Sequence, residues 1–301
     1  MPNSAAQSAK PFQGCGTALV TPFAADQSLD EPALRALIRS QIAGGVNFLV
    51  PCGTTGETPT LSPAEHLRVV AITLEEAKPR GIPVLGGAGG NNTAHVIEVA
   101  RALESLGVDG ILSVAPYYNK PTQDGLEQHF AAIAAAIHIP VVLYNVPGRT
   151  GSNIAAPTVL KLARIPNIVA VKEASGNLAQ IGAILAAAPR DFDVLSGDDA
   201  LTLAILALGG QGLISVASNP APAAMASLVA AARAGDFARA REIHFRYLPL
   251  MDALFVESSP APAKCLMAQM GLCNEVLRLP LVPVRPATRD RLAAVRRELS
   301  L

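Results

Sequence analysis

A lysine at the end of an apolar run is the residue in this sequence best suited to covalent chemistry. The run covers residues 168–171, and Lys172 follows it directly. Strand alternation places the lysine on the same face as Ala170, where a small side chain leaves room. Burial there makes an ammonium ion costly, and the neutral amine favoured instead can form an imine with a ketone. The alternative interpretation is an ion pair with Glu173 or Asp198 that only stabilises the fold.

No other lysine of the sequence is placed in this way. The chain has six lysines, and the remaining five occupy polar or loop-like surroundings: Lys10, Lys78, Lys120, Lys161 and Lys264. The sequence therefore favours Lys172 over the others as an imine-forming residue.

Hydroxyl-bearing residues follow two other apolar runs. Tyr144 ends the run before that of Lys172, so the two should be neighbours in a sheet, where a phenol can relay protons during imine formation and carbon–carbon bond formation. Core packing with a satisfied hydroxyl is the alternative for Tyr144. Thr54 and Thr55 stand in a glycine-bounded turn. Their hydroxyl and backbone N–H groups can either hold a carboxylate or simply cap the turn.

Arg149 is the cation that could recognise an acidic substrate. It stands in a loop just after the run that ends at Tyr144. A guanidinium group binds a carboxylate through two parallel hydrogen bonds, so this residue suits carboxylate recognition. A solvated loop arginine is the alternative.

Metal and phosphate chemistry are poorly supported by the sequence. The five histidines show no metal-ligand spacing. Asp198 and Asp199, together with Glu57 or Glu173, could hold a hard cation, but paired acids at a helix start are commonly caps. The loops after the last two strands, which bind phosphate in many barrels, carry no cation here, and this argues against a phosphorylated sugar. We therefore expect neither a metal nor another cofactor.

Eight short β-rich runs must position these residues. They cover residues 17–21, 48–50, 83–86, 110–114, 141–144, 168–171, 194–196 and 213–216. Their starts lie roughly 20 to 35 residues apart, with helical patterns between them. Continuous apolar runs are typical of strands covered on both faces, and the alternation predicts a closed parallel (β/α)8 barrel of the α/β class. The alternative is an open doubly wound sheet, although the glycine fingerprint of its dinucleotide-binding members is absent.

Helix signals and a loss of strand signals divide the chain. Asp30 caps a helix that a glycine pair ends, and residues 62–65 form a capping box at the start of a second helix. Strand signals stop at about residue 235. We therefore predict a catalytic barrel over residues 1–235 and a C-terminal helical domain over residues 236–301. In such a barrel, the residues at the strand ends converge on one mouth.

The composition disfavours several partners and compartments. Half of the 301 residues are apolar, and 24 basic residues balance 24 acidic ones, so no net charge attracts nucleic acid or an anionic membrane. The four cysteines form no C-x-x-C pair, which favours reduced thiols. Residues 1–13 lack the apolar core of a signal peptide, and the most apolar stretch, residues 201–217, is broken by glycines. We expect a cytoplasmic protein.

Several segments, taken together, resemble one known family. They are GTTGE (53–57), PYYNKPTQDGL (116–126), YNVPGRTG (144–151), VKEASGN (171–177), LSGDD (195–199) and GLISV (212–216). The sequence is similar over nearly its whole length to the dihydrodipicolinate synthase family, within the N-acetylneuraminate lyase superfamily of pyruvate-dependent aldolases. The resemblance implies a (β/α)8 barrel with a C-terminal helical domain, assembled as a homotetramer that is a dimer of dimers.

The resemblance also implies a role for each site residue. Lys172 is implied to form an imine with pyruvate, and Arg149 to bind the carboxylate of L-aspartate 4-semialdehyde. The residues implied to relay protons are Tyr144, Thr55 and Tyr118, the last from a neighbouring subunit. The residues implied to line the pyruvate pocket are Thr54, Thr55, Gly197 and Ile214. The implied product is a cyclic hydroxytetrahydrodipicolinate, at the entry to diaminopimelate and lysine synthesis.

A sugar-acid or other 2-oxo-acid lyase is the alternative within the superfamily. Such a lyase needs groups that recognise hydroxyls in place of a carboxylate clamp at Arg149. It also usually has a serine at the position of Thr54. The resemblance therefore favours the synthase.

One departure from the family pattern concerns feedback by lysine. The resemblance implies an allosteric pocket formed by Thr58, His66, Asn91, His95 and Tyr117. All of these except His95 are compatible with the family pattern. Lysine-inhibited members usually carry a glutamate where this chain has His95 and a histidine where it has Pro63. Without that glutamate the ammonium group of the ligand lacks a counter-charge, so we predict weak or absent inhibition by lysine.

Overall fold

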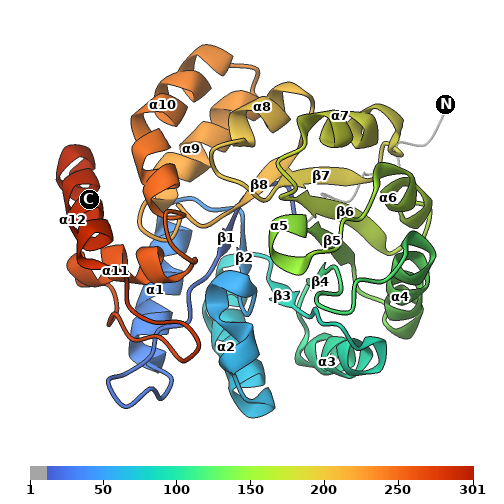
Figure 1. The fold of residues 1–301 in the computed structure, drawn as a ribbon, viewed down its shortest axis with the longest axis horizontal. Coiled ribbons are helices and arrows are strands. Elements are labelled where there is room, and N and C mark those ends of the chain that lie inside the picture. The colour runs from blue at the N-terminus through green and yellow to red at the C-terminus, as the bar shows by residue number, and fades with distance from the viewer. Residues whose placement is uncertain (1–11) are drawn as a thin grey trace.

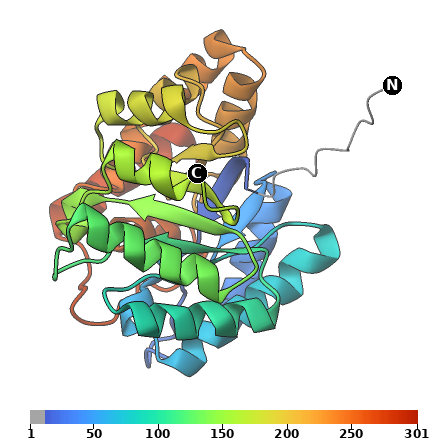
Figure 2. The same cartoon turned by 90° about the vertical axis from the view of Figure 1, so that its right-hand side faces the viewer.

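Eight parallel strands form a ring at the centre of the computed structural model, which describes residues 12–301. The strands are β1 (Gly14–Ala18), β2 (Phe48–Val50), β3 (Leu85–Gly87), β4 (Gly110–Val114), β5 (Val141–Asn145), β6 (Ile168–Glu173), β7 (Asp193–Ser196) and β8 (Gly212–Ser215). Their order is β2-β1-β8-β7-β6-β5-β4-β3, and a parallel bridge between Leu49 and Val84 joins its two ends. Helices surround the ring (Figures 1 and 2). The predicted (β/α)8 barrel is confirmed, and the open doubly wound sheet is wrong.

The first strand is shifted from its predicted place. The sequence predicts residues 17–21, whereas β1 covers Gly14–Ala18. Glycine normally weakens a strand, so composition counts against this segment. The structure requires Gly16 nevertheless, because a Cβ atom there would lie 2.2 Å from the Phe48 ring. The other strands lie within two residues of their predicted ends.

Helices follow the strands around the outside of the barrel. They are α1 (Glu31–Ala43), α2 (Pro63–Ala77), α3 (Thr93–Leu106), α4 (Gln123–Ala136), α5 (Pro147–Thr150), α6 (Ala156–Leu162), α7 (Leu178–Ala187), α8 (Thr202–Ala207) and α9 (Pro222–Arg233), with 3₁₀ turns η1 (Thr54–Gly56), η2 (Thr58–Thr60) and η3 (Lys78–Arg80). The predicted cap is confirmed, because the Asp30 side chain accepts a hydrogen bond from the Ala33 backbone N–H. The predicted capping box is confirmed by reciprocal hydrogen bonds between Ser62 and Glu65.

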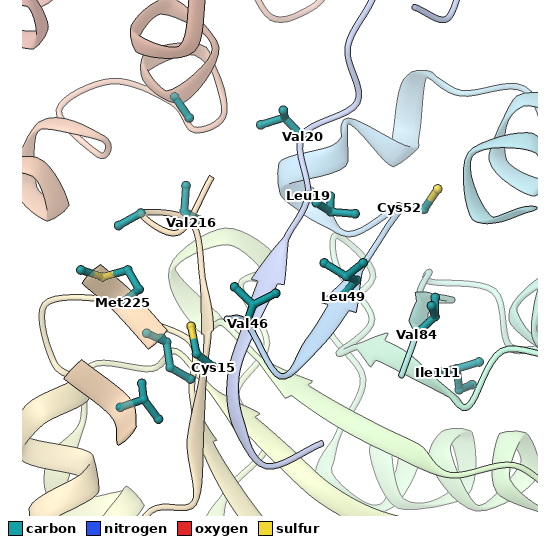
Figure 3. Packing of buried hydrophobic residues seen from close by; sticks show 14 of the residues in the cluster. Cys15, Leu19, Val20, Val46, Leu49, Cys52, Val84, Ile111, Val216 and Met225 are labelled. Carbon is teal, nitrogen blue, oxygen red and sulfur yellow. The ribbon is translucent and has the colours of Figure 1, made fainter. Parts of the chain in front are cut away.

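Alternate positions of the strands enter two different cores. Leu49 of β2 packs outward against the helices, whereas Phe48 and Val50 point into the barrel. Figure 3 shows part of the outer core, where side chains of β1, β2 and α9 meet. Because both faces of each strand are buried, the strands read as continuous apolar runs.

Three helices follow the barrel: α10 (Phe237–Ala253), α11 (Ala261–Gln269) and α12 (Pro286–Leu299). α10 packs on α8 and α9, and Figure 1 shows α11 and α12 outside the ring, on the side of α1. The segment after α11 returns to the barrel, where Arg278 donates a hydrogen bond to the Gln27 carbonyl (2.7 Å). The predicted division at residue 235 falls between α9 and α10, and it stays a prediction because α10 rests on barrel helices.

Two expectations about compartment meet the structure only in part. The signal-peptide analysis concerns residues 1–13, of which 1–11 lie outside the described residues. Residues 201–217 contain α8, a turn and β8, as predicted. Over residues 12–301, none of the helices combines the length and apolar character that crossing a membrane requires. All four cysteines are free, and Cys273 is partly exposed whereas the other three are buried.

Candidate active site

Lys172 lies at the carboxyl end of β6 and is 5% exposed. Its partner in the neighbouring strand β5 is Tyr144, as predicted. The Lys172 Nζ atom lies 4.2 Å from the centroid of the Tyr144 ring. The amine is therefore held against an electron-rich aromatic face at the end of the barrel where an active site is expected.

The carboxylates next to Lys172 bind other groups. The Asn145 side-chain amide donates a hydrogen bond to Glu173 (2.6 Å). The backbone N–H of Ala200 donates to Asp198 (2.9 Å). Among residues 12–301, no carboxylate forms an ion pair with Lys172. The interpretation of Lys172 as a structural ion pair is therefore wrong.

Thr54 and Thr55 lie on the 3₁₀ turn η1, between two residues with left-handed backbone. Cys52 precedes the turn with φ of 56°, and Glu57 ends it with φ of 54°. Such a conformation costs of order 1–3 kcal/mol for a non-glycine residue and is concentrated at functional sites. Neither threonine side chain caps the turn, so the capping interpretation is wrong. Thr55 is buried, whereas Thr54 is exposed.

A cavity of about 820 Å³ opens beside these residues. The predicted catalytic and substrate-binding residues on its wall are Thr54, Tyr144 and Arg149. Those absent from its wall are Thr55, Lys172, Gly197, Ile214 and Tyr118. Lys172 contacts the ring of Tyr144, which lines the cavity, and Ile214 belongs to the same inner cluster as Tyr144.

Gly197 makes room for the lysine side chain. A Cβ atom at this position would lie 2.9 Å from the Lys172 Cε atom and 2.8 Å from the Ala174 Cβ atom. A larger residue would therefore displace the lysine stem. The structure places Gly197 against Lys172, and its role in a pyruvate pocket stays a prediction.

Arg149 lies on α5, a four-residue helix, and not in the predicted loop. Pro147 starts this helix and Gly151 ends it with φ of 69°, since proline suits a first turn and glycine suits a left-handed end. Arg149 is exposed and lines the cavity, and its guanidinium group has no ion-pair partner among the described residues. Its role as a carboxylate clamp stays a prediction.

Tyr118 is not brought to Lys172 within one chain. The residue is 88% exposed and has φ of 72°. Its backbone N–H donates to the Thr150 carbonyl (3.4 Å), and the residue does not line the cavity. The expected contribution from a neighbouring subunit therefore stays a prediction.

The allosteric candidates gather on the wall of the same cavity. They are Thr58, His66, Asn91, His95 and Tyr117. The His66 ring is buried with no hydrogen-bond partner for Nε2, and burial lowers the pKa of this histidine. Glu98, which the sequence alone does not single out, also lines the cavity and lies 3.5 Å from the His95 ring. Its spacing, one helical turn after His95, is the signal that could have identified it.

The paired acids after β7 have structural partners. Asp199 is buried and accepts hydrogen bonds from the Ser215 hydroxyl (2.5 Å) and the Val216 backbone N–H (3.0 Å). Burial raises the pKa of Asp199. In the part of the chain that the structure describes, no three or more His, Cys, Asp or Glu side chains form a metal-binding group. The expectation of no metal stays a prediction.

The expectation that all lysines other than Lys172 have polar or loop-like surroundings is wrong for Lys264. This residue is fully buried in α11 and forms an ion pair with Glu57. The sequence does not indicate this ion pair, because Lys264 lies in a helix that is buried on all sides and Glu57 is far away along the chain.

The match to a family model decides which family this is. The model of the dihydrodipicolinate synthetase family matches residues 11–298. The chain belongs to this family. The family predicted from the motifs is therefore confirmed, and the chain is an enzyme of the lyase type, as predicted.

Relatives of the dihydrodipicolinate synthetase family match along almost the whole chain. The 4-hydroxy-tetrahydrodipicolinate synthase of Koribacter versatilis is 56% identical over 95% of this chain and 96% of its own length. The protein of the same name from Acidobacterium capsulatum is 54% identical over 96% of each chain. The crystal structure of dihydrodipicolinate synthase from Thermotoga maritima has a TM-score of 0.95 at 43% identity, covering 97% of this chain and 99% of that one.

Proposed function

We propose that this protein is a 4-hydroxy-tetrahydrodipicolinate synthase that condenses pyruvate with L-aspartate 4-semialdehyde. The observation that carries the proposal is the amine of Lys172, which is buried against Tyr144 with no carboxylate partner among residues 12–301. A structural lysine needs a counter-charge, whereas an imine-forming lysine needs an amine free to attack a carbonyl carbon. The names of the relatives support the same reaction.

The proposed reaction passes through an imine. Lys172 Nζ attacks C2 of pyruvate, and water leaves. Loss of a proton from C3 gives an enamine, whose C3 attacks the aldehyde carbon of the semialdehyde. The amine of the semialdehyde portion then attacks the imine carbon, and Lys172 leaves with the cyclic hydroxytetrahydrodipicolinate as product. Proton transfer accompanies these steps, and we assign it to the hydroxyls of Tyr144 and Thr55.

Substrate recognition is assigned to residues around the cavity. Arg149 binds the carboxylate of the semialdehyde, because this residue lines the cavity and its guanidinium group has no acidic partner among the described residues. Thr54, which also lines the cavity, binds pyruvate together with Thr55. Gly197 and Ile214 complete the pyruvate pocket around the lysine stem.

We propose a homotetramer, built as a dimer of dimers, in the cytoplasm. The exposed Tyr118, held in a left-handed conformation, supports contact with a second subunit, where its hydroxyl would join the proton relay. Sedimentation at assay concentration measures the assembly. A fully active monomer would contradict the role of Tyr118 in a neighbouring site.

Reductive trapping tests the imine. Pyruvate with borohydride should add permanent mass to the peptide that contains Lys172. The peptide with the other buried lysine, Lys264, is the internal control and should remain unmodified. We propose that the reaction needs no metal or other cofactor. Turnover that a chelator abolishes, with no trapping, would instead indicate a metal-dependent aldolase. Pyruvate binding with neither trapping nor turnover would indicate a binding barrel.

A panel of aldehydes tests the second substrate. The synthase should turn over the semialdehyde faster than sugar aldehydes at equal concentration. A preference for a sugar aldehyde would indicate the lyase of the same superfamily, with the imine chemistry unchanged.

We also propose that lysine inhibits this enzyme weakly or not at all. His95 stands on the cavity wall where lysine-inhibited relatives are expected to have a glutamate. Glu98 also reaches this wall, 3.5 Å from the His95 ring. An inhibition constant from the low-micromolar to the sub-millimolar range would contradict the proposal, and Glu98→Gln would then show whether this carboxylate binds the ligand.

A further inference from the structure

A charged pair joins the C-terminal helices to the turn that carries Thr54 and Thr55. The side chains of Lys264 and Glu57 form an ion pair, and both are 0% exposed. The Arg278 backbone N–H donates a hydrogen bond to the other carboxylate oxygen of Glu57 (3.2 Å). Both oxygens of Glu57 are therefore bound by the C-terminal segment.

The same segment holds the surroundings of the turn. Two cations contact the Phe23 ring, with Lys264 Nζ 4.1 Å and Arg278 Cζ 4.3 Å from its centroid. Arg278 also donates to the Thr60 carbonyl (2.8 Å) and pairs with Glu65 (2.5 Å). Through these contacts, Lys264 and Arg278 of the C-terminal segment connect the loop before α1, the turn and the start of α2.

Glu57 is the residue through which the C-terminal segment contacts the turn. Its backbone has φ of 54° and ψ of 35° directly after η1. A non-glycine residue keeps such a conformation only where its surroundings hold it. On the other side, the Thr21 hydroxyl donates to the Gly56 carbonyl (2.7 Å). The orientation of the turn therefore depends on contacts to Glu57 and Gly56.

Stability alone is a weak explanation for this pair. Desolvation of two charges offsets most of their attraction, and apolar residues of similar size often stabilise a fold as well or better. Burial lowers the pKa of Lys264, and the Glu57 carboxylate opposes that change. An ion pair at this place fixes the direction of one carboxylate more strictly than apolar packing would.

We infer that Lys264 and Glu57 are positioning residues, which hold the turn so that the Thr55 hydroxyl reaches the reacting groups on Lys172. The inference rests on the proposed function. It gives the C-terminal helices a direct part in the chemistry, through a turn that belongs to the barrel.

Three variants test the inference: Glu57→Gln, Lys264→Met and the two together. The rate of imine trapping at saturating pyruvate is measured where each variant is folded, with kcat and the KM of the semialdehyde. Each single variant should slow trapping and kcat roughly tenfold or more, because a displaced catalytic group loses reactivity steeply. The KM of the semialdehyde should change by less than about twofold, because Arg149 lies on α5, away from the turn.

The double variant separates positioning from stability. It leaves no unpaired buried charge, so its unfolding temperature should return toward that of the parent. Its trapping should remain slow, because the side chain at position 57 has lost the ion pair that anchors it. If Glu57→Gln or Lys264→Met fails to fold, the double variant decides alone, and trapping by it at the parental rate would overturn the inference.

Glu76→Gln is the matched control. Glu76 is a buried carboxylate of α2 that pairs with Arg39 (2.7 Å) and Arg35 (3.2 Å), away from the turn. This variant should unfold at a lower temperature than the parent but form the imine at the parental rate. Folded Glu57 and Lys264 variants that behave like it would overturn the inference while leaving the proposed function intact. A parent enzyme that is not trapped by pyruvate would reject both.

Discussion

The two lysines that are buried among residues 12–301, Lys172 and Lys264, occupy opposite environments. Lys264 has an ion pair, a backbone carbonyl acceptor at Val276 (2.9 Å) and a ring face, so its charge is fully accommodated. Lys172 has a ring face at 4.2 Å and no ion pair within the described residues. Burial alone therefore does not identify a reactive lysine. The informative feature is an amine that the fold buries and leaves without a counter-charge.

Replacing each lysine with methionine gives the strongest test of this contrast. Lys172→Met should lower turnover roughly 10³-fold or more and abolish trapping, as loss of a covalent nucleophile does elsewhere. The free energy of unfolding should stay the same or rise, because the variant removes a buried amine that lacks an acidic partner. Steady-state kinetics and urea unfolding check both effects. Turnover within tenfold of the parent would place the imine on another residue.

Lys264→Met should have its main effect on stability. We expect the free energy of unfolding to fall by about 3–5 kcal/mol, because Glu57 would be buried without its counter-charge. Urea unfolding with a constant m-value measures the loss. A change of less than about 1 kcal/mol, the value typical of an exposed pair, would mean that water or another cation replaces the lysine.

The hydroxyl next to Lys172 is the next test. Tyr144→Phe keeps the ring against the amine and removes only the hydroxyl. Turnover should fall about 10²-fold if the phenol relays protons, with the free energy of unfolding little changed. Tyr247→Phe, on α10, is the control for loss of a tyrosine hydroxyl. A near-normal rate for Tyr144→Phe would assign this residue to packing.

Arg149 tests substrate binding apart from the lysines. Arg149→Ala should raise the KM of the semialdehyde roughly tenfold, the low end for a charged hydrogen bond at an exposed site. Trapping with pyruvate alone should be unaffected. Arg149→Lys should lie between the parent and the alanine variant, because it keeps the charge without the two-bond geometry. An unchanged KM in both variants would remove Arg149 from the site.

The smallest effect is expected at a third buried titratable group, His129, on α4. Burial lowers the pKa of His129 to about 4, whereas an unfolded histidine has a pKa of about 6.5. The unfolded state thus binds more protons between these values, and stability should fall as the pH falls from about 6.5 to about 4. His129→Gln should flatten this slope in unfolding curves, whereas the surface variant His138→Gln is the control. An unaltered slope would assign the acid sensitivity to other groups.

The sequence predicts the site best where one short segment contains the signal. Lys172 ends an apolar strand and Tyr144 ends the one before, so strand alternation and parallel pairing suffice to bring them together. Those two regularities also account for the ring of strands. The first strand was misplaced because close packing between Gly16 and Phe48 decides its register, and propensity does not describe such packing.

Ion pairs between segments that are distant along the chain cannot be predicted from this sequence. Lys264 lies in a helix whose residues from Ala261 to Met267 are all buried, and only the folded chain shows that Glu57 faces it. Likewise, Tyr118 could be given a place only by resemblance, because no local pattern shows what an exposed ring touches. Contacts between distant segments are set by the whole topology, which periodicity does not describe.

The contact of the Phe23 ring with both Lys264 and Arg278 has a practical consequence for anyone who engineers this enzyme. Chimaeras that join a barrel from one homologue to a tail from another must inherit all three side chains, and Glu57, from compatible parents. A recombination point placed after α9 would separate them, so crossover libraries should treat residues 21–65 and 257–285 as a single exchangeable block.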